Sequence, residues 1–171
     1  MILTGILLFV LLVAIDQYSK IIAAASLKGT APFVLIRGVL ELRYLENHGA
    51  AFGIMQNGRI FFTVVALVVL AVIAVVLRKA PTTRRFLPFR ICLVFLAAGA
   101  VGNLIDRVRF GYVRDFIYFS LINFPIFNVA DIYVTVCTFL LAILLIVVYK
   151  DEELSFLSLS SFLGKGGKTG E

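Results

Sequence analysis

The chain has 171 residues, of which 61% are hydrophobic and 15% are charged, and its mean hydropathy is +1.05. A water-soluble domain of this length would not have this composition, so the sequence predicts an integral membrane protein. The net charge of +6 does not indicate a nucleic-acid partner, because the basic residues cluster beside apolar runs and not among base-stacking aromatic residues.

Four apolar stretches predict an all-α membrane protein with four transmembrane helices, in one polytopic domain over residues 1–150. A crossing needs roughly 20 residues at 1.5 Å per residue, so the shorter stretches must include flanking residues. The expected spans are about 2–25, 60–77, 91–105 and 132–149. Residues 151–171 are expected to form a cytoplasmic tail that is partly disordered.

The connection between the second and third spans fixes the predicted orientation. It is short, it contains no acid, and it carries five basic residues: Arg78, Lys79, Arg84, Arg85 and Arg90. The positive-inside rule places this loop, and with four spans both termini, in the cytoplasm. The longer connections, about 26–59 and 106–130, then lie outside. Residues 116–127 are apolar but short and contain Asn123 and Pro125, which favours an interfacial or re-entrant segment over a fifth crossing.

Polar residues interrupt the first span and the connection after it. Asp16 and Lys20 are four residues apart and can meet on one helix face, either as a pair that makes insertion tolerable or as part of a site. Residues 40–44 alternate between apolar and charged side chains, and residues 33–36 are expected to pair with them as a small sheet on the membrane surface. Asn47 is either a turn residue or an amide that binds peptide backbone, and Gly49 permits a backbone to approach closely.

Further polar residues lie where the third span ends and the fourth begins. Asn103 and Arg107 share a helix face, and Asp106 points away from Arg107. This pair either links helices and reaches lipid head groups, or holds the loop that carries a carboxylate. Asn128 precedes Asp131 by three residues, so it is either an N-cap with an acid in the first helical turn or part of the same site.

Asp115 and Asp131 both lie in strongly apolar sequence. A carboxylate at the bilayer centre costs roughly 2.5–3.5 kcal/mol on insertion scales, so such residues usually mark a function. Two carboxyl groups that share a water hold one proton between them, and can hydrolyse an amide as general base and general acid. The single His48 and two cysteines without a ligand motif argue against a catalytic His triad or a zinc site, so no metal or cofactor is expected.

Five short motifs occur in an order that resembles one known family over nearly the whole chain. They are DQYSK at 16–20, NHGAAF at 47–52, GNLIDR at 102–107, VRDF at 113–116 and FNVAD at 127–131. On these residues the chain resembles lipoprotein signal peptidase, also called signal peptidase II, an aspartyl protease of the bacterial inner membrane. Each motif alone is weak evidence, whereas the ordered set is specific.

The resemblance implies that Asp115 and Asp131 are the catalytic pair. It implies that other residues support the site or hold substrate backbone, namely Asp16, Lys20, Asn47, Gly49, Asn103, Arg107 and Asn128. The implied substrates are prolipoproteins cut just before a cysteine that already carries diacylglycerol, with the active site toward the outer leaflet. The implied fold has four transmembrane helices, a small extracytoplasmic β-sheet and a short surface helix, and the cyclic peptide globomycin is the expected inhibitor.

Two departures from the family pattern are noted. Arg114 stands where an apolar residue is common, and is expected to lower the apparent pKa of the acidic pair; Ile132 and Tyr133 are expected to narrow the cleft. The main alternative function is a small ion or proton transporter, because intramembrane acids also mark ion paths. A structural helical subunit would leave the two aspartates unexplained. The Gly-x-Gly-Asp motif of other intramembrane aspartyl proteases is absent.

Overall fold

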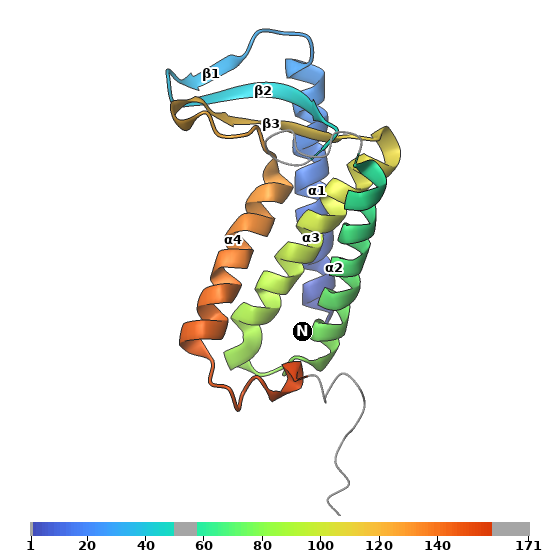
Figure 1. Cartoon of the computed structure of the whole chain (residues 1–171), viewed down its shortest axis with the longest axis vertical. Helices are drawn as coiled ribbons and strands as arrows, with labels where there is room; N and C mark the ends of the chain where they lie inside the picture. The colour runs from blue at the N-terminus through green and yellow to red at the C-terminus, as the bar shows by residue number, and fades with distance from the viewer. Residues whose placement is uncertain (1, 50–57, 159–171) are drawn as a thin grey trace, which may run out of the picture.

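A computed structural model of the protein describes residues 2–49 and 58–158. Four long helices run side by side, and a three-stranded antiparallel sheet lies across one end of them (Figure 1). The helices are α1 (Ile2–Leu27), α2 (Arg59–Lys79), α3 (Leu87–Phe110) and α4 (Val129–Ile143). A 3-10 turn, η2 (Arg84–Phe86), precedes α3, and a π-helical turn, η4 (Leu144–Val148), extends α4. The predicted fold class is confirmed.

All four helices are long and apolar enough to cross a membrane, with candidate spans Ile2–Leu27, Arg59–Lys79, Arg84–Phe110 and Val129–Val148. Their outer faces carry large apolar side chains that stay exposed, such as Ile60 at 79% and Ile146 at 81%. Faces of this kind suit hydrocarbon and not water. The helices run beyond the apolar stretches of the sequence because polar residues at their ends, such as Asn103 and Arg107, remain helical.

Helix α3 is central, and α1, α2 and α4 all pack against it. Its contact surface is built from small buried residues, including Ala98, Gly99 and Gly102. A Cβ atom added at Gly99 would lie 2.7 Å from the carbonyl oxygen of Ala130 on α4. Small side chains at these positions therefore let the backbones of α3 and α4 approach closely, as is usual where helices meet in a membrane.

The end of the bundle opposite the sheet is closed by aromatic residues. Phe86 stacks on Tyr149 with ring centroids 4.5 Å apart, and Phe156 packs edge-on against Phe86 and Phe89. The expected tail therefore begins with residues that contact the helix ends, including the 3-10 turn η5 (Ser155–Leu157). Residues 159–171, the remainder of that tail, lie outside the described residues.

The sheet has the order β1 (Phe33–Ile36), β2 (Leu40–Asn47) and β3 (Val113–Phe119). The expected pairing of the first two strands is confirmed, and Gly38, at φ 72°, adopts the left-handed conformation in the turn between them. The third strand was not expected. Residues 116–119 of the segment predicted to be interfacial or re-entrant belong to this strand and pair with β2, and they do not form a fifth crossing.

After β3 the chain turns back and does not cross the bundle. A 3-10 turn, η3 (Ser120–Ile122), is followed by Asn123 in the left-handed conformation at φ 49°. Phe127 then forms an antiparallel bridge with Ile117, and α4 begins two residues later. The strand β3 and the start of α4 therefore lie at the same end of the bundle.

Candidate active site

Asp115 and Asp131 come from separate elements and line one cavity of about 640 Å³ beneath the sheet. Asp115 lies in β3 opposite Leu45 of β2, and Asp131 lies in the first turn of α4. The structure brings these two residues together at one end of the helix bundle, as the sequence predicts.

Asp115 is almost fully buried and accepts hydrogen bonds from two amide groups. The side-chain nitrogen of Asn47 donates to its Oδ2 at 2.8 Å, and that of Asn128 donates to its Oδ1 at 2.6 Å. Burial and the negative charge of Asp131 nevertheless raise the pKa of Asp115 to about 7. This carboxyl group is therefore partly protonated at neutral pH.

Asp131 forms a capping box with Asn128 at the start of α4. The Asn128 side chain accepts from the backbone N–H of Asp131, and the Asp131 Oδ2 accepts from the backbone N–H of Asn128, both at 3.1 Å. The Oδ1 of Asp131 accepts from the side-chain nitrogen of Asn103 at 2.8 Å. The N-cap interpretation of Asn128 is thus confirmed, and the same side chain also contacts Asp115.

The orientation of the Asn103 amide is set by its oxygen. Lys20 donates to that oxygen at 2.8 Å, and Asn128 donates to it at 3.1 Å. An ammonium group has only donors, so the amide oxygen must face Lys20 and the amide nitrogen must face Asp131. Lys20 on α1 therefore orients the Asn103 amide group that donates a hydrogen bond to Asp131.

The predicted pairing of Asp16 with Lys20 is confirmed. Their side chains are 2.9 Å apart and fully buried. The second oxygen of Asp16 accepts from the backbone N–H of Ala130, at 3.0 Å, in the first turn of α4. Asp16 thus compensates the charge of Lys20 and also ties α1 to the helix that carries Asp131, and Gly102 leaves the room for its carboxylate.

Arg114 is directed away from Asp115 because successive side chains of a strand point to opposite faces. Its Nε and Nη2 donate to the two oxygens of Asp106 at 3.0 and 2.7 Å, and Nη2 also donates to Gln17 at 3.1 Å. Burial and Asp131 contribute most to the raised pKa of Asp115, and Arg114 is not among its main causes, so the expected lowering by Arg114 stays a prediction. Asp106 engages the guanidinium group in a bidentate contact instead.

Gln17 joins Asp16, Asp106 and Arg114 in one hydrogen-bond network beneath the sheet, and the sequence analysis did not identify it as a site residue. Gln17 donates to the carbonyl of Gly102, at 2.9 Å, and to the carboxylates of Asp16 and Asp106, while its oxygen accepts from Arg114. Its position beside Asp16 in the first motif was the signal that could have identified it.

Arg107, Asn47 and Gly49 also line the cavity. The Asn47 oxygen accepts from the backbone N–H of Gly49, at 3.0 Å, so Asn47 is both a turn residue and a partner of Asp115. The Arg107 guanidinium lies 5.3 Å from the ring of Phe62. In residues 2–49 and 58–158, no described group accepts a hydrogen bond from this guanidinium.

Most of the cavity wall is apolar. Ile132 lies in this wall, whereas Tyr133 points elsewhere and packs edge-on against Phe95 with ring centroids 5.4 Å apart. The expected narrowing of the cleft therefore concerns Ile132 and not Tyr133. The wall consists of Val113, Phe119, Ile122, Phe124, Pro125, Ile126, Phe127, Ile132, Thr135 and Val136.

Comparison with known proteins identifies a single family. The sequence model described as Signal peptidase (SPase) II matches residues 8–147. Curated proteins named lipoprotein signal peptidase from Streptococcus pyogenes, serotypes M5 (strain Manfredo) and M1, are 39% identical over 150 residues, which cover 86% of this chain and 94% of theirs.

Two solved structures have the same fold. Both are described as bacterial membrane enzymes determined by the in meso method, one at 2.3 Å and one at 1.9 Å resolution, and each aligns with a TM-score of 0.72. The first is 31% identical and covers 98% of this chain and 94% of its own. The second is 33% identical and covers 85% and 94%.

Proposed function

Since the chain belongs to the signal peptidase II family of membrane aspartic endopeptidases, as its motifs predict, we propose that it removes signal peptides from prolipoproteins with Asp115 and Asp131 as the catalytic pair. The observation that carries this proposal is that two carboxyl groups, remote in sequence, line one cavity, and that the charge of Asp131 helps to raise the pKa of Asp115. Paired carboxyl groups of this kind hold one proton between them and can act as base and acid in turn.

The raised pKa of Asp115 supports the starting roles of the two residues in this mechanism. The pair shares one proton, and we place it on Asp115, whose pKa is raised to about 7, so that Asp131 acts first as the base. Asp131 takes a proton from the attacking water while Asp115 donates a hydrogen bond to the scissile carbonyl. As the tetrahedral intermediate collapses, a proton passes to the leaving amine and the two residues exchange roles.

The three asparagines hold this pair in place. Asn47 and Asn128 donate to Asp115, and Asn103 donates to Asp131, so each carboxyl group is fixed by at least one amide. An acid and a base that are already held in position lower the activation barrier of hydrolysis, because they do not have to be oriented during the reaction. Arg107 projects into the same cavity with donors that no described residue occupies, and is proposed to bind a carbonyl of the substrate backbone.

The apolar wall suits a substrate that carries lipid. We propose that the diacylglyceryl chains of the modified cysteine lie against the wall formed by β3, the turn after it and α4, and that cleavage occurs just before this cysteine. The basic loop between α2 and α3 favours a cytoplasmic location for that loop and for both termini. The acidic pair then faces the outer leaflet of the bacterial cytoplasmic membrane.

The family resemblance also supports inhibition by globomycin. A cyclic peptide with an apolar side would occupy the same cavity and exclude substrate from the two carboxyl groups. In contrast, an ion-transport function finds little support, because the buried charged groups gather near the sheet. At the other end of the bundle the described buried residues are apolar and aromatic, and charged pairs such as Arg85 with Glu153 are not buried.

The test of this function uses two forms of one prolipoprotein. Purified protein is incubated with a diacylglyceryl-modified substrate and with the unmodified substrate, and the products are separated by mass. We expect cleavage of the modified form alone, before its cysteine, and inhibition of this cleavage by globomycin. Equal cleavage of both forms, or of neither, would overturn the proposed substrate class.

A further inference from the structure

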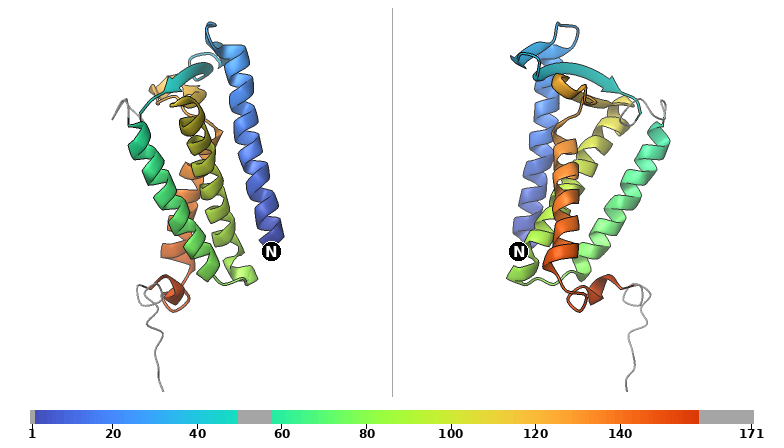
Figure 2. Two further views of the ribbon diagram at one scale, coloured as in Figure 1. Left: turned by 90° about the vertical axis from the view of Figure 1, so that its right-hand side faces the viewer. Right: turned by 60° about the vertical axis from the view of Figure 1, so that its left-hand side comes forward.

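A second cavity, of about 770 Å³, lies at the end of the bundle away from the acidic pair. Helices α1 and α2 lie on opposite sides of α3 in both views of Figure 2, and the cavity is bordered by the first turns of α1, the last turn of α2 and the first half of α3. Large apolar side chains around it, such as Ile2 and Ile6, stay more than half exposed. The protein itself does not fill this space.

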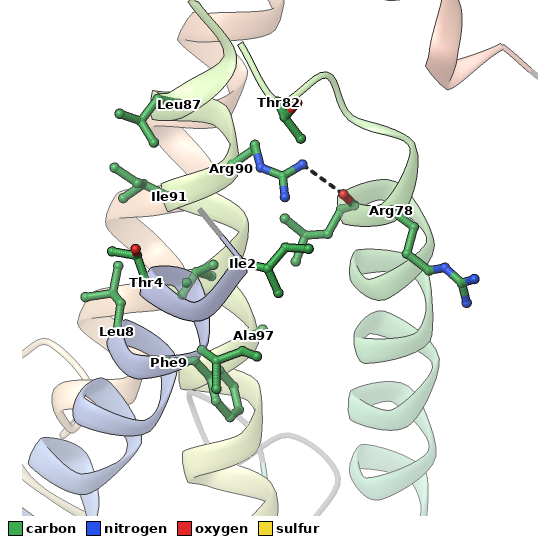
Figure 3. A pocket seen from close by; sticks show the side chains of 14 residues that line it. Ile2, Thr4, Leu8, Phe9, Arg78, Thr82, Leu87, Arg90, Ile91 and Ala97 are labelled. Carbon is green, nitrogen blue, oxygen red and sulfur yellow. Dashed lines mark hydrogen bonds between the residues drawn. The ribbon is translucent and has the colours of Figure 1, made fainter. Parts of the chain in front are cut away.

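The lining of this cavity is apolar along its length and basic at one end. Phe9 and Ala97 lie at its deep end, and Thr4, Thr82 and Arg90 are polar residues nearer the helix ends (Figure 3). Among the described residues that line it, none is acidic. Figure 3 shows the guanidinium of Arg78, in contrast, pointing away from the cavity.

Arg90 is held in place and still has donors to offer. Its Nη1 donates to the carbonyls of Leu77 and Ala80, both at 2.9 Å, at the end of α2. Among the residues that the structure describes, its other guanidinium nitrogens donate no hydrogen bond. A fixed positive group with open donors above an apolar space matches a molecule with an anionic head and an aliphatic chain.

We propose that this cavity binds an anionic phospholipid of the leaflet opposite the active site, with its phosphate at Arg90 and an acyl chain along α1 and α3. Basic pockets between transmembrane helices near the cytoplasmic surface are typical sites for acidic lipid head groups. The lipid fills the space that α1 and α2 leave on α3. The site is separate from the wall proposed for the diacylglyceryl chains of the substrate.

Gly5 allows the location of the site to be tested. It lines the cavity, and a Cβ atom added there would meet no atom within 4 Å. Gly5→Leu therefore fills part of the cavity without disturbing the packing of the protein. Leu11→Phe is the matched control, because Leu11 is an exposed residue of α1 that does not line the cavity.

The measurement is a titration of the purified full-length protein with phosphatidylglycerol or phosphatidylcholine of the same acyl chains, followed by native mass spectrometry. We expect phosphatidylglycerol to bind about fivefold more tightly, the factor that one basic side chain near a membrane surface provides. Gly5→Leu should weaken its binding about tenfold, because the leucine occupies volume that the chain would pack against. Leu11→Phe should leave it unchanged.

Arg90→Gln should remove the preference for the anionic lipid. Both lipids should then bind equally, through their acyl chains. Because Arg90 also holds the end of α2, folding of this variant is checked by its thermal unfolding, and Gly5→Leu tests the site even if this variant is unstable. Equal binding of the two lipids to the unaltered protein, or undiminished binding to Gly5→Leu, would overturn the proposal.

Two other occupants predict different results. If the site bound free phosphate, inorganic phosphate alone would displace phosphatidylglycerol at millimolar concentration. If the signal peptide of the substrate occupied the cavity, substrate would displace the lipid, and Gly5→Leu would raise KM for cleavage. Either result would overturn the phospholipid assignment, whereas lipid binding that persists in the presence of both ligands supports it.

Discussion

Replacement of Gly99 by alanine is expected to disturb the proposed catalytic pair, Asp115 and Asp131, without touching either residue. Gly99 lies where α3 passes the start of α4, and a Cβ atom there would lie 2.7 Å from the carbonyl oxygen of Ala130 and 2.8 Å from Cγ2 of Val134. Ordinary contact begins at 3.4 Å, so the two helices must separate by about 0.7 Å at this level.

The consequence for the site follows from a hydrogen bond between the same helices. The side-chain nitrogen of Asn103 lies 2.8 Å from Oδ1 of Asp131. A separation of about 0.7 Å along this direction takes the pair beyond the usual 2.7–3.2 Å range of such bonds. Overpacking of this kind costs roughly 1–3 kcal/mol of stability, and a misplacement near 1 Å in a catalytic site lowers the rate about 100-fold.

The assay compares the cleavage rate of a diacylglyceryl-modified prolipoprotein with the thermal unfolding of the same preparation. Gly5→Ala is the matched control, because the added methyl group meets no atom within 4 Å, and this variant should cleave at the normal rate. It should also gain about 0.5–1 kcal/mol of helix stability. A Gly99→Ala protein that cleaved at the normal rate would refute the argument that α3–α4 spacing positions Asp131.

Three further predictions concern charge. The pKa of Asp115 is raised to about 7 in the folded protein, so the folded protein binds more protons than the unfolded chain between about pH 4 and 7. The stability of the protein should therefore fall as the pH rises through this window. Cleavage should decline above about pH 7, where Asp115 loses its proton. Asp16→Ala should lower stability by about 3 kcal/mol, because buried Lys20 loses its nearer carboxylate and keeps only that of Asp106 at 3.8 Å, yet it should reduce cleavage less than substitution of Asp115 or Asp131. Arg114→Met should lower stability by about 1.5–3 kcal/mol, because buried Asp106 loses its guanidinium partner but keeps Lys20, and it should leave the pH midpoint of cleavage unchanged.

Each of these has a clear contrary result. The pH dependence of stability between about pH 4 and 7 should become weaker in Asp115→Asn, and an unchanged dependence would assign the titration to another group. An Asp16→Ala protein that is well folded and completely inactive would give Asp16 a more direct role. A shifted pH midpoint in Arg114→Met would mean that the guanidinium acts on the acidic pair after all.

The sequence predicted the four helices and the polar residues of the site better than it predicted the helix ends and the connections between the helices. Apolar stretches near 20 residues specify spans with little ambiguity, because few other structures satisfy the backbone in hydrocarbon. The ends of the spans were less predictable, since Asn103, Asp106 and Arg107 continue α3 well beyond its apolar part. Such residues do not signal a helix end when their side chains have buried partners.

Strand β3 was missed for a related reason. Residues 113–119 are mostly apolar on both faces, and the alternation typical of a half-buried strand is absent. Pairing with β2 depends on residues far away in the chain, which local sequence does not specify. The same limitation applied to Arg114, because its partner Asp106 becomes evident only when β3 is placed against the end of α3.

Single substitutions of the two acids test the central claim most directly. Asp115→Asn and Asp131→Asn keep the size of each side chain, and are compared with Asp151→Asn, an exposed residue outside the site, for folding and for cleavage of lipidated prolipoprotein. The account predicts that both site variants fold and cleave at no more than about a hundredth of the normal rate, the loss expected when a general acid or base is removed. Turnover near normal in either one, with the control unaffected, would contradict it.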